Sequence, residues 1–280
     1  MIIDAQVHLW TAESPSRQWP SDGQRRAHLK TPLSYGDMLS EMDRTGVDRA
    51  IIVPPSWEGD RNDYASLAAH RYPDRFAVMG RLCLEDPESR PLLKTLIMDP
   101  AILGVRVNFS DSKLRWLSDG TADWFWPAAE KADIPVMLHC PGQQQKIAEI
   151  AEHHSSLKII IDHMNLSTRL PVDAIADSVR ATANLGRFPN LSVKLSSIPV
   201  YSRDNFPYAN FDHHLRHMID SFSAERCHWG SDISHGKGEI PYENYVRHFT
   251  EGTFFRTETE RSWIMGKSLQ NILKWPIDHS

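Results

Sequence analysis

Residues 134–163, IPVMLHCPGQQQKIAEIAEHHSSLKIIIDH, decide the fold class of this chain. The stretch begins and ends with a short apolar run, IPVMLHC and LKIIIDH, and the residues between them are of helical length. There Ile147, Ile150 and Ala151 recur at steps of three and four, which is typical of an amphipathic helix. Because parallel strands need a connection of helical length, the stretch predicts a strand, a helix and a parallel strand.

The same alternation covers most of the chain. Six more apolar runs rich in Ile, Val and Leu are predicted as strands: 2–9, 48–54, 75–82, 102–109, 191–196 and 225–232. Helices are predicted over 35–46, 62–71, 122–132, 143–154, 173–186 and 207–222. Eight strands alternating with helices predict an α/β fold, a TIM-type (β/α)8 barrel. A doubly wound open sheet is the alternative, although the sequence has no phosphate-binding turn of the GxGxxG type.

The domain organisation follows from the even spread of these elements. The 280 residues suit one barrel, which typically takes about 250 residues, and no linker divides them. We therefore expect a single domain over residues 1–280. The polar stretch 11–34 has no strong apolar period and is expected to form a long loop after the first strand.

Composition and charge exclude several classes of protein. Hydrophobic residues make up 41% and charged residues 24%, which is typical of globular proteins and argues against disorder. The net charge of −5 argues against a nucleic-acid partner, and no apolar stretch reaches the roughly 20 residues of a membrane span. Three cysteines and a start without the pattern of a signal peptide predict a reduced, cytoplasmic protein. A homodimer is left open.

Several predicted strands end on a polar residue that can do chemistry. These residues are Gln6, His8, Arg106, Asn108, His139, Asp162, His163, Lys194 and Asp232. In a barrel, catalytic groups come from the C-terminal ends of different strands, so we expect these side chains to meet. Gln6 and His8 are two residues apart and share a face of their strand. By the same rule Asp162 is expected to point away from His163 and to be structural.

Five segments resemble the amidohydrolase superfamily. They are IDAQVHLW (3–10), PVMLHC (135–140), IIIDHM (159–164), HWGSD (228–232) and WIMGKSLQNILKW (263–275). Their order and spacing are similar to the amidohydrolase-related branch, which contains lactonases such as pyrone-dicarboxylate hydrolases, and also decarboxylases. The resemblance spans nearly the whole chain and implies the same barrel, closed by the last segment as a helix.

The resemblance also implies roles for single residues. His8, His139 and Asp232 match positions that hold one divalent metal, zinc or manganese, in the family. Asp232 matches the residue that takes the proton of the attacking water, and His163 the residue that polarises the substrate oxygen. The first metal-binding histidine of the family is Gln6 here. Since zinc prefers nitrogen and sulfur ligands to an amide oxygen, catalysis without a metal is left open.

Cations near the expected barrel mouth predict the kind of substrate. Arg106, Lys194 and His235 follow or lie on strands, and Asn108 shares the face of Arg106. Gln6, which shares the face of His8, is a further candidate for substrate binding. An arginine can bind a carboxylate with two parallel hydrogen bonds, which favours a small anionic substrate. Our first hypothesis is a hydrolase of a lactone or related cyclic ester. The alternatives are a metal-dependent, non-oxidative decarboxylase of an aromatic or muconate-type acid, and an inactive barrel that only binds a ligand.

Overall fold

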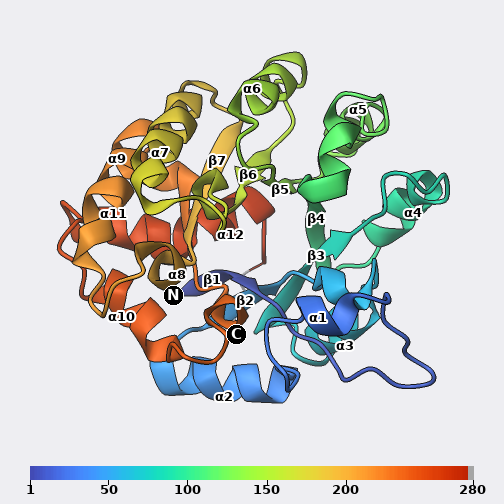
Figure 1. Cartoon of the computed structure of the whole chain (residues 1–280), viewed down its shortest axis with the longest axis horizontal. Helices are drawn as coiled ribbons and strands as arrows, with labels where there is room; N and C mark the ends of the chain where they lie inside the picture. Colours follow the sequence, from blue (N-terminus) through green and yellow to red (C-terminus); the bar gives the residue numbers. More distant parts are fainter. Residues whose placement is uncertain (277–280) are drawn as a thin grey trace.

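A computed structural model of the chain describes residues 1–276. Its strands are β1 (Ile3–Val7), β2 (Arg49–Ile52), β3 (Phe76–Arg81), β4 (Ile102–Asn108), β5 (Val136–His139), β6 (Ile159–Ile161), β7 (Leu191–Ser196) and β8 (Cys227–Gly230). They form one parallel sheet in the order of the sequence and curl into a barrel (Figure 1). The predicted (β/α)8 barrel is confirmed, with each strand inside its predicted run. The last residues of the predicted domain, 277–280, lie outside the described residues.

The barrel closes where β8 lies against β1. The backbone amide of Asp232 donates to the Gln6 carbonyl oxygen at 2.9 Å. Beside it, the buried Asp4 carboxylate accepts the Ser231 amide at 2.8 Å, the Ser231 hydroxyl at 2.5 Å and the Tyr242 hydroxyl at 2.9 Å. Burial outweighs these hydrogen bonds and raises the pKa of Asp4 to about 6. This side-chain network joins the ends of the chain's first and last strands.

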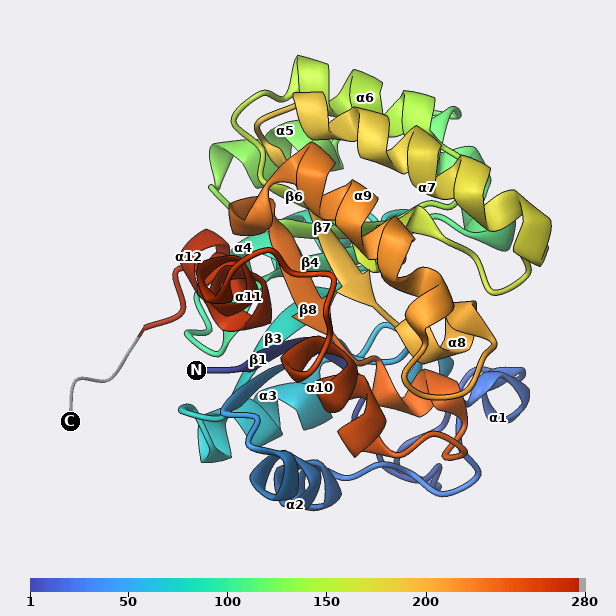
Figure 2. The same cartoon turned by 90° about the vertical axis from the view of Figure 1, so that its left-hand side faces the viewer.

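Helices surround the barrel on its outer face (Figures 1 and 2). They are α1 (Gly23–Arg26), α2 (Tyr35–Thr45), α3 (Asp63–Arg71), α4 (Ser89–Leu96), α5 (Phe125–Lys131), α6 (Gln144–His153), α7 (Ile175–Ala183), α8 (Ile198–Ser202), α9 (Asp212–Phe222), α10 (Tyr242–Thr250), α11 (Glu258–Ser262) and α12 (Ser268–Leu273). Among residues 1–276, no helix is long and apolar enough to cross a membrane.

The helix ends show where the sequence prediction was accurate and where it was not. Helix α2 begins at a capping box made by Ser34 and Asp37 and ends at Gly46, whose φ of 73° suits glycine. The helix predicted from residue 207 begins only at 212, since a short 3-10 turn precedes it. Helices α4, α8, α10 and α11 lie outside the predicted helical ranges. The expected loop over 11–34 is confirmed apart from the short α1.

The apolar core has two parts. The larger part lies between the strands and the surrounding helices. The smaller part fills one end of the barrel interior, where Ile51, Met79, Met137 and Ile160 pack with Leu269 of α12. In Figure 2, α12 lies near the start of β1, and α1 and α8 lie at the other end of the barrel. The apolar interior therefore closes the end where the strands begin, and polar side chains occupy the end where they finish.

An irregularity in β1 brings two predicted site residues to the interior. Ile3 and Ala5 belong to the interior core, and strict alternation would then turn Gln6 and His8 outward. The register of β1 with β2 shifts between Asp4 and Val7. This bulge changes the face that the following residues present. Gln6 and His8 consequently point into the barrel on the same side, as predicted.

Candidate active site

A cavity of about 370 Å³ opens at the C-terminal ends of the strands. It is lined by Gln6, His8, His28, Ser56, Trp57, Arg106, Asn108, Phe109, Ser110, Leu114, His139, Pro141, His163, Leu166, Ser167, Thr168, Arg169, Tyr201, Asp232 and His235. The structure thus brings together most of the residues predicted for the site. Lys194 is not among the described residues that line the cavity, and it lies fully buried in the barrel.

Left-handed backbone conformations aim three polar side chains at this end of the barrel. His163, Ser197 and Asp232 follow β6, β7 and β8 and have φ angles of 52°, 59° and 52°. Residues other than glycine rarely adopt such angles, and they cluster at functional sites. The predicted outward direction of Asp162 was wrong, because the left-handed backbone, and not the alternation of the strand, directs His163 inward. Asp162 continues the inward face of Ile160, and the turn at His163 brings that side chain inward as well.

Asp232 is a buried carboxylate with one oxygen available for chemistry. Its Oδ2 accepts the Ser197 hydroxyl at 3.0 Å and lies 3.1 Å from His235 Nδ1. Its Oδ1 is buried and has no hydrogen-bond partner among the described residues. Burial disfavours the charged form, but the hydrogen bond and charge of His235 outweigh it and hold the pKa of Asp232 well below its usual value. Asp232 is therefore ionised at neutral pH.

His8 faces Asp232 as a second acceptor. Its Nδ1 lies 2.6 Å from the Val53 carbonyl oxygen, which can only accept, so Nδ1 carries the proton and donates. Burial lowers the pKa of His8 to about 4, and the ring is neutral at pH 7. Its Nε2 then presents a lone pair 3.3 Å from Asp232 Oδ1. Two acceptors 3.3 Å apart can share one donor, such as a water molecule that lies beside both and not between them.

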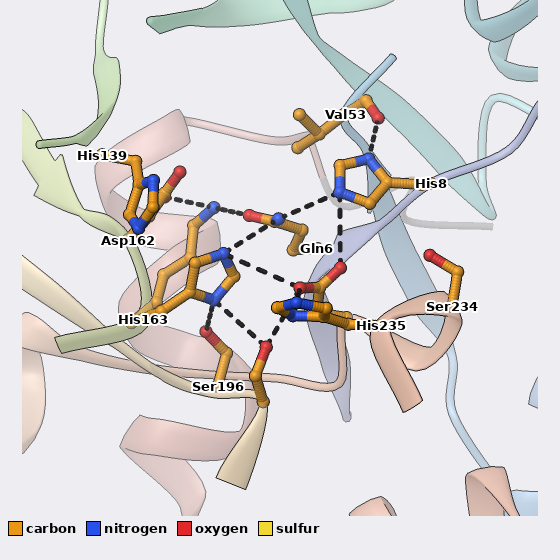
Figure 3. A network of polar contacts seen from close by, with 12 residues as sticks. Gln6, His8, Val53, His139, Asp162, His163, Ser196, Ser234 and His235 are labelled. Atoms are coloured by element: carbon orange, nitrogen blue, oxygen red, sulfur yellow. Dashed lines mark hydrogen bonds and ion pairs between the residues drawn. The ribbon is translucent and has the colours of Figure 1, made fainter. Parts of the chain in front are cut away.

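Gln6 places its amide nitrogen beside two histidine rings (Figure 3). Gln6 Nε2 lies 3.2 Å from His163 Nε2 and 3.4 Å from His8 Nε2. An amide nitrogen only donates, so both ring nitrogens accept. His163 consequently carries its proton on Nδ1, which lies 2.7 Å from the Ser196 hydroxyl oxygen. Burial also lowers the pKa of His163 well below its usual value, which keeps this ring neutral.

Beneath the cavity lies a buried ionic cluster. Asp162 Oδ1 forms an ion pair with the Lys194 ammonium at 2.7 Å, and Asp162 Oδ2 accepts the Arg106 Nε–H at 3.1 Å. Burial disfavours the Asp162 carboxylate, but both cations outweigh it and lower its pKa. Lys194 also donates to Gln6 Oε1 at 2.7 Å. The structure thus places Lys194 beneath Gln6, so that any contribution of Lys194 to substrate binding passes through that amide.

His139 lies on the opposite wall from His8. Its Nε2 donates to the Leu166 carbonyl oxygen at 3.0 Å, and its Nδ1 lies 3.4 Å from Asn108 Oδ1. Burial and the charge of Arg106 lower the pKa of His139 to about 4. The neighbouring Cys140 is buried, which raises the pKa of its thiol and leaves it no role as a nucleophile at neutral pH.

Sequence reasoning missed His28. This residue comes from the long loop after β1 and lines the cavity. Its ring stacks on His235 with centroids 4.8 Å apart, and its Nδ1 lies 3.0 Å from the Ser234 hydroxyl. Burial lowers the pKa of His28 to about 3, whereas the hydrogen bond to Asp232 outweighs burial and raises the pKa of His235. A histidine in an aperiodic loop carries no sequence signal that would place it at a barrel mouth.

Similarity to known proteins decides what kind of protein carries this site. A family model described as amidohydrolase matches residues 3–267. The chain belongs to the amidohydrolase family. An L-fucono-1,5-lactonase from Burkholderia ambifaria is 25% identical to this amidohydrolase over 243 residues, which cover 82% of this chain and 79% of the lactonase. The predicted resemblance is confirmed.

Two solved structures share the fold of this amidohydrolase. An amidohydrolase from Burkholderia multivorans with bound zinc has a TM-score of 0.81 at 17% identity, covering 99% of this chain and 100% of that one. A probable 2-pyrone-4,6-dicarboxylic acid hydrolase from Acinetobacter baumannii with citric acid bound has a TM-score of 0.76 at 18% identity, covering 98% and 99%. One protein that shares this fold therefore binds zinc.

In this amidohydrolase the atoms that could bind a metal ion are directed to other partners. Among residues 1–276 there is no group of three or more His, Cys, Asp or Glu side chains placed to hold a metal ion. His139 directs Nε2 to a carbonyl oxygen, and Gln6 directs its only ligand atom, Oε1, to Lys194. The lone pairs of His8 and His163 face the Gln6 amide hydrogens. This arrangement of donors does not fit a divalent metal.

Proposed function

We propose that this amidohydrolase hydrolyses a lactone, or a related cyclic ester, of a small anionic molecule. The observation that carries the proposal is the pair of facing acceptors, Asp232 Oδ1 and His8 Nε2, 3.3 Å apart. A water molecule beside both can donate one hydrogen to each, and it then takes the His8 lone pair from the Gln6 amide, whose nitrogen lies 3.4 Å away. Its oxygen lone pair is then free to attack a carbonyl carbon held in the cavity.

The residues of the cavity account for each proton of this reaction. The water oxygen bonds to the carbonyl carbon while its proton moves to Asp232 Oδ1, and the carbonyl π electrons move to oxygen. When the carbonyl forms again, the bond to the ring oxygen breaks. That oxygen takes the proton from Asp232 and leaves as a hydroxyl. The product is a hydroxy acid, which loses its acid proton to the solvent at neutral pH.

Charge within the cavity supports an anionic substrate. Arg106 lines the cavity, and the raised pKa of His235 favours its charged form. Both are suited to a carboxylate. The related fuconolactonase acts on a lactone, and the probable pyrone-dicarboxylate hydrolase holds citric acid, a carboxylic acid. Asn108 and His139 line the same wall and would contact polar groups of the ring.

The test measures proton release from a panel of sugar lactones and carboxylated pyrones. The wild type is compared with Asp232→Asn and with Asp177→Asn, a control on the solvent-facing side of α7, where the carboxylate pairs with the exposed Arg180. We expect acid release by the wild type and the control, and a loss of about 100-fold or more in Asp232→Asn.

Three other results would contradict the proposal. An Asp232→Asn rate within tenfold of wild type would remove the general base. Carbon dioxide release from aromatic acids, with no action on lactones, would establish the decarboxylase alternative. Thermal stabilisation by a panel compound that is never turned over would establish a barrel that only binds its ligand.

A further inference from the structure

The orientation of the Gln6 amide is fixed from below. Lys194 is fully buried. Its ammonium donates to Gln6 Oε1 at 2.7 Å and forms an ion pair with Asp162 Oδ1 at 2.7 Å. Hydrogen bonds from a charged donor are roughly twice as strong as neutral ones. The amide oxygen is therefore directed into the barrel, and the amide nitrogen is directed to the cavity.

The opposite orientation of the amide would lose its contacts with Lys194, His8 and His163. It would place the amide nitrogen, a donor, against the Lys194 ammonium, which is also a donor. It would place Oε1 against the lone pair of His8 Nε2, since His8 uses its only proton on the Val53 carbonyl. Figure 3 shows one end of the Gln6 amide directed toward Asp162 and the other end toward His8 and His163. One amide hydrogen is therefore directed to His163 Nε2 and the other to His8 Nε2 at the cavity, and no amide oxygen faces the cavity.

The hydrogen that faces His8 lies where the reaction needs positive charge. Because the attacking water occupies the lone pair of His8 Nε2, this hydrogen is released for a new acceptor, while the other remains on His163. Gln6 Nε2 is 3.4 Å from His8 Nε2, which is in turn 3.3 Å from Asp232 Oδ1, the atoms that would hold the attacking water. A carbonyl carbon within reach of that water brings its oxygen near the amide nitrogen. Preorganised N–H donors at such a position stabilise the negative charge that develops on the oxygen.

We propose that Gln6 is the oxyanion donor of this amidohydrolase and that Lys194 is its positioning residue. The inference rests on the proposed lactone hydrolysis and assigns a role that a metal would otherwise fill. As water attacks, the carbonyl oxygen gains the π electron pair and accepts a hydrogen bond from Gln6 Nε2. No proton leaves Gln6. When the carbonyl forms again, the electron pair returns and the ring C–O bond breaks.

The first experiment separates kcat from KM. Gln6→Leu keeps the size of the side chain and removes the donor, and Lys194→Met removes the charge that orients it. We expect kcat of Gln6→Leu to fall about 100- to 1,000-fold with KM nearly unchanged. The control is Gln145→Leu on the exposed face of α6, where the amide donates to Glu149. A Gln6→Leu kcat within threefold of wild type, in a folded variant, would overturn the proposal.

The second experiment reads the orientation without any activity. Two-dimensional 15N NMR of the histidine rings in the wild type should show His8 and His163 protonated on Nδ1, with hydrogen-bonded Nε2. In Lys194→Met and in Gln6→Leu the Nε2 resonance of His163 should shift. A ring of His163 protonated on Nε2 in the wild type would overturn the orientation, because the amide nitrogen could not then donate to it.

The third experiment uses zinc alone as a probe. Gln6→Glu places a carboxylate oxygen where the amide nitrogen lies, beside the lone pairs of His8 and His163. We expect zinc to bind this variant at least tenfold more tightly than wild type in calorimetry, and equal affinities would overturn the proposal. If wild type hydrolyses no lactone, the proposed function fails by itself, and the NMR and zinc results still decide how Gln6 is oriented.

Discussion

Replacement of Asp162 by asparagine tests the buried ionic cluster. The Asp162 side chain is fully buried and contacts Lys194 Nζ at 2.7 Å and Arg106 Nε at 3.1 Å. The neutral amide would leave two buried cations without an anion. Breaking a buried pair in this way typically costs about 3 to 5 kcal/mol of the free energy of unfolding. For a chain of this size, that is a fall in Tm of roughly 6 to 20 °C.

The assay is urea unfolding at pH 7, with calorimetry for Tm. Asp177→Asn, which breaks only an exposed pair, is expected to cost less than about 1 kcal/mol. The double variant Asp162→Asn with Lys194→Met should cost less than the sum of the single variants, because it removes the unpaired ammonium. Since the pKa of Asp162 is lowered in the folded state, its contribution is present above the usual carboxyl pKa and is lost as pH falls.

One result would refute this reasoning about the cluster. If Asp162→Asn costs no more than Asp177→Asn, then water or another anion already compensates Lys194 and Arg106. The ammonium that orients Gln6 would in that case not depend on Asp162.

Two further outcomes concern stability. Burial lowers the pKa of His8 to about 4 and of His228 to about 3, so the unfolded chain binds more protons as pH falls below 6.5. Below these folded-state pKa values, His8 should have removed about 3 kcal/mol and His228 about 5 kcal/mol of the free energy of unfolding. Equal free energies of unfolding in urea at pH 7 and pH 5 would contradict this. A Cβ on Gly104 would lie 2.4 Å from the Pro135 carbonyl oxygen, so Gly104→Ala should cost about 1 to 3 kcal/mol. On helix α2, a Cβ on Gly36 would meet nothing closer than 3.6 Å, so Gly36→Ala should raise the free energy of unfolding by up to about 1 kcal/mol. A Gly104→Ala variant that is more stable in urea than Gly36→Ala would refute both glycine predictions.

The barrel was predictable from the sequence because its strands are buried on both faces. Runs such as 157–163 are almost continuously apolar, and each change to a helical period marks a crossover. The polar residue at a strand's end stands out against such a run. This is why Gln6, His8, His139 and Asp232 can be selected from the amino-acid sequence alone. Helix ends were less accurate, since short 3-10 turns extend or shorten the apolar period.

The directions of side chains were harder to predict. Alternation along an ideal strand gave the correct face for Gln6 and His8, although only through a bulge in β1 that the sequence does not reveal. The same rule failed for the pair Asp162 and His163, because the left-handed backbone at His163 turns its side chain to the inward face that Asp162 already shares with Ile160. Left-handed residues other than glycine depend on the surrounding packing, and local sequence carries little information about them.

The sequence alone presents Gln6 as a weaker version of a metal ligand. That interpretation treats the amide as an oxygen donor, yet an amide has an oxygen and a nitrogen end and offers the site only one of them. The choice is made by Lys194, 188 residues away along the chain, which takes the oxygen. With a histidine at position 6, the same ammonium would face a ring and would repel a divalent cation bound to it. Glutamine on β1 and lysine on β7 thus form one functional unit, and the chemistry of either residue depends on the other.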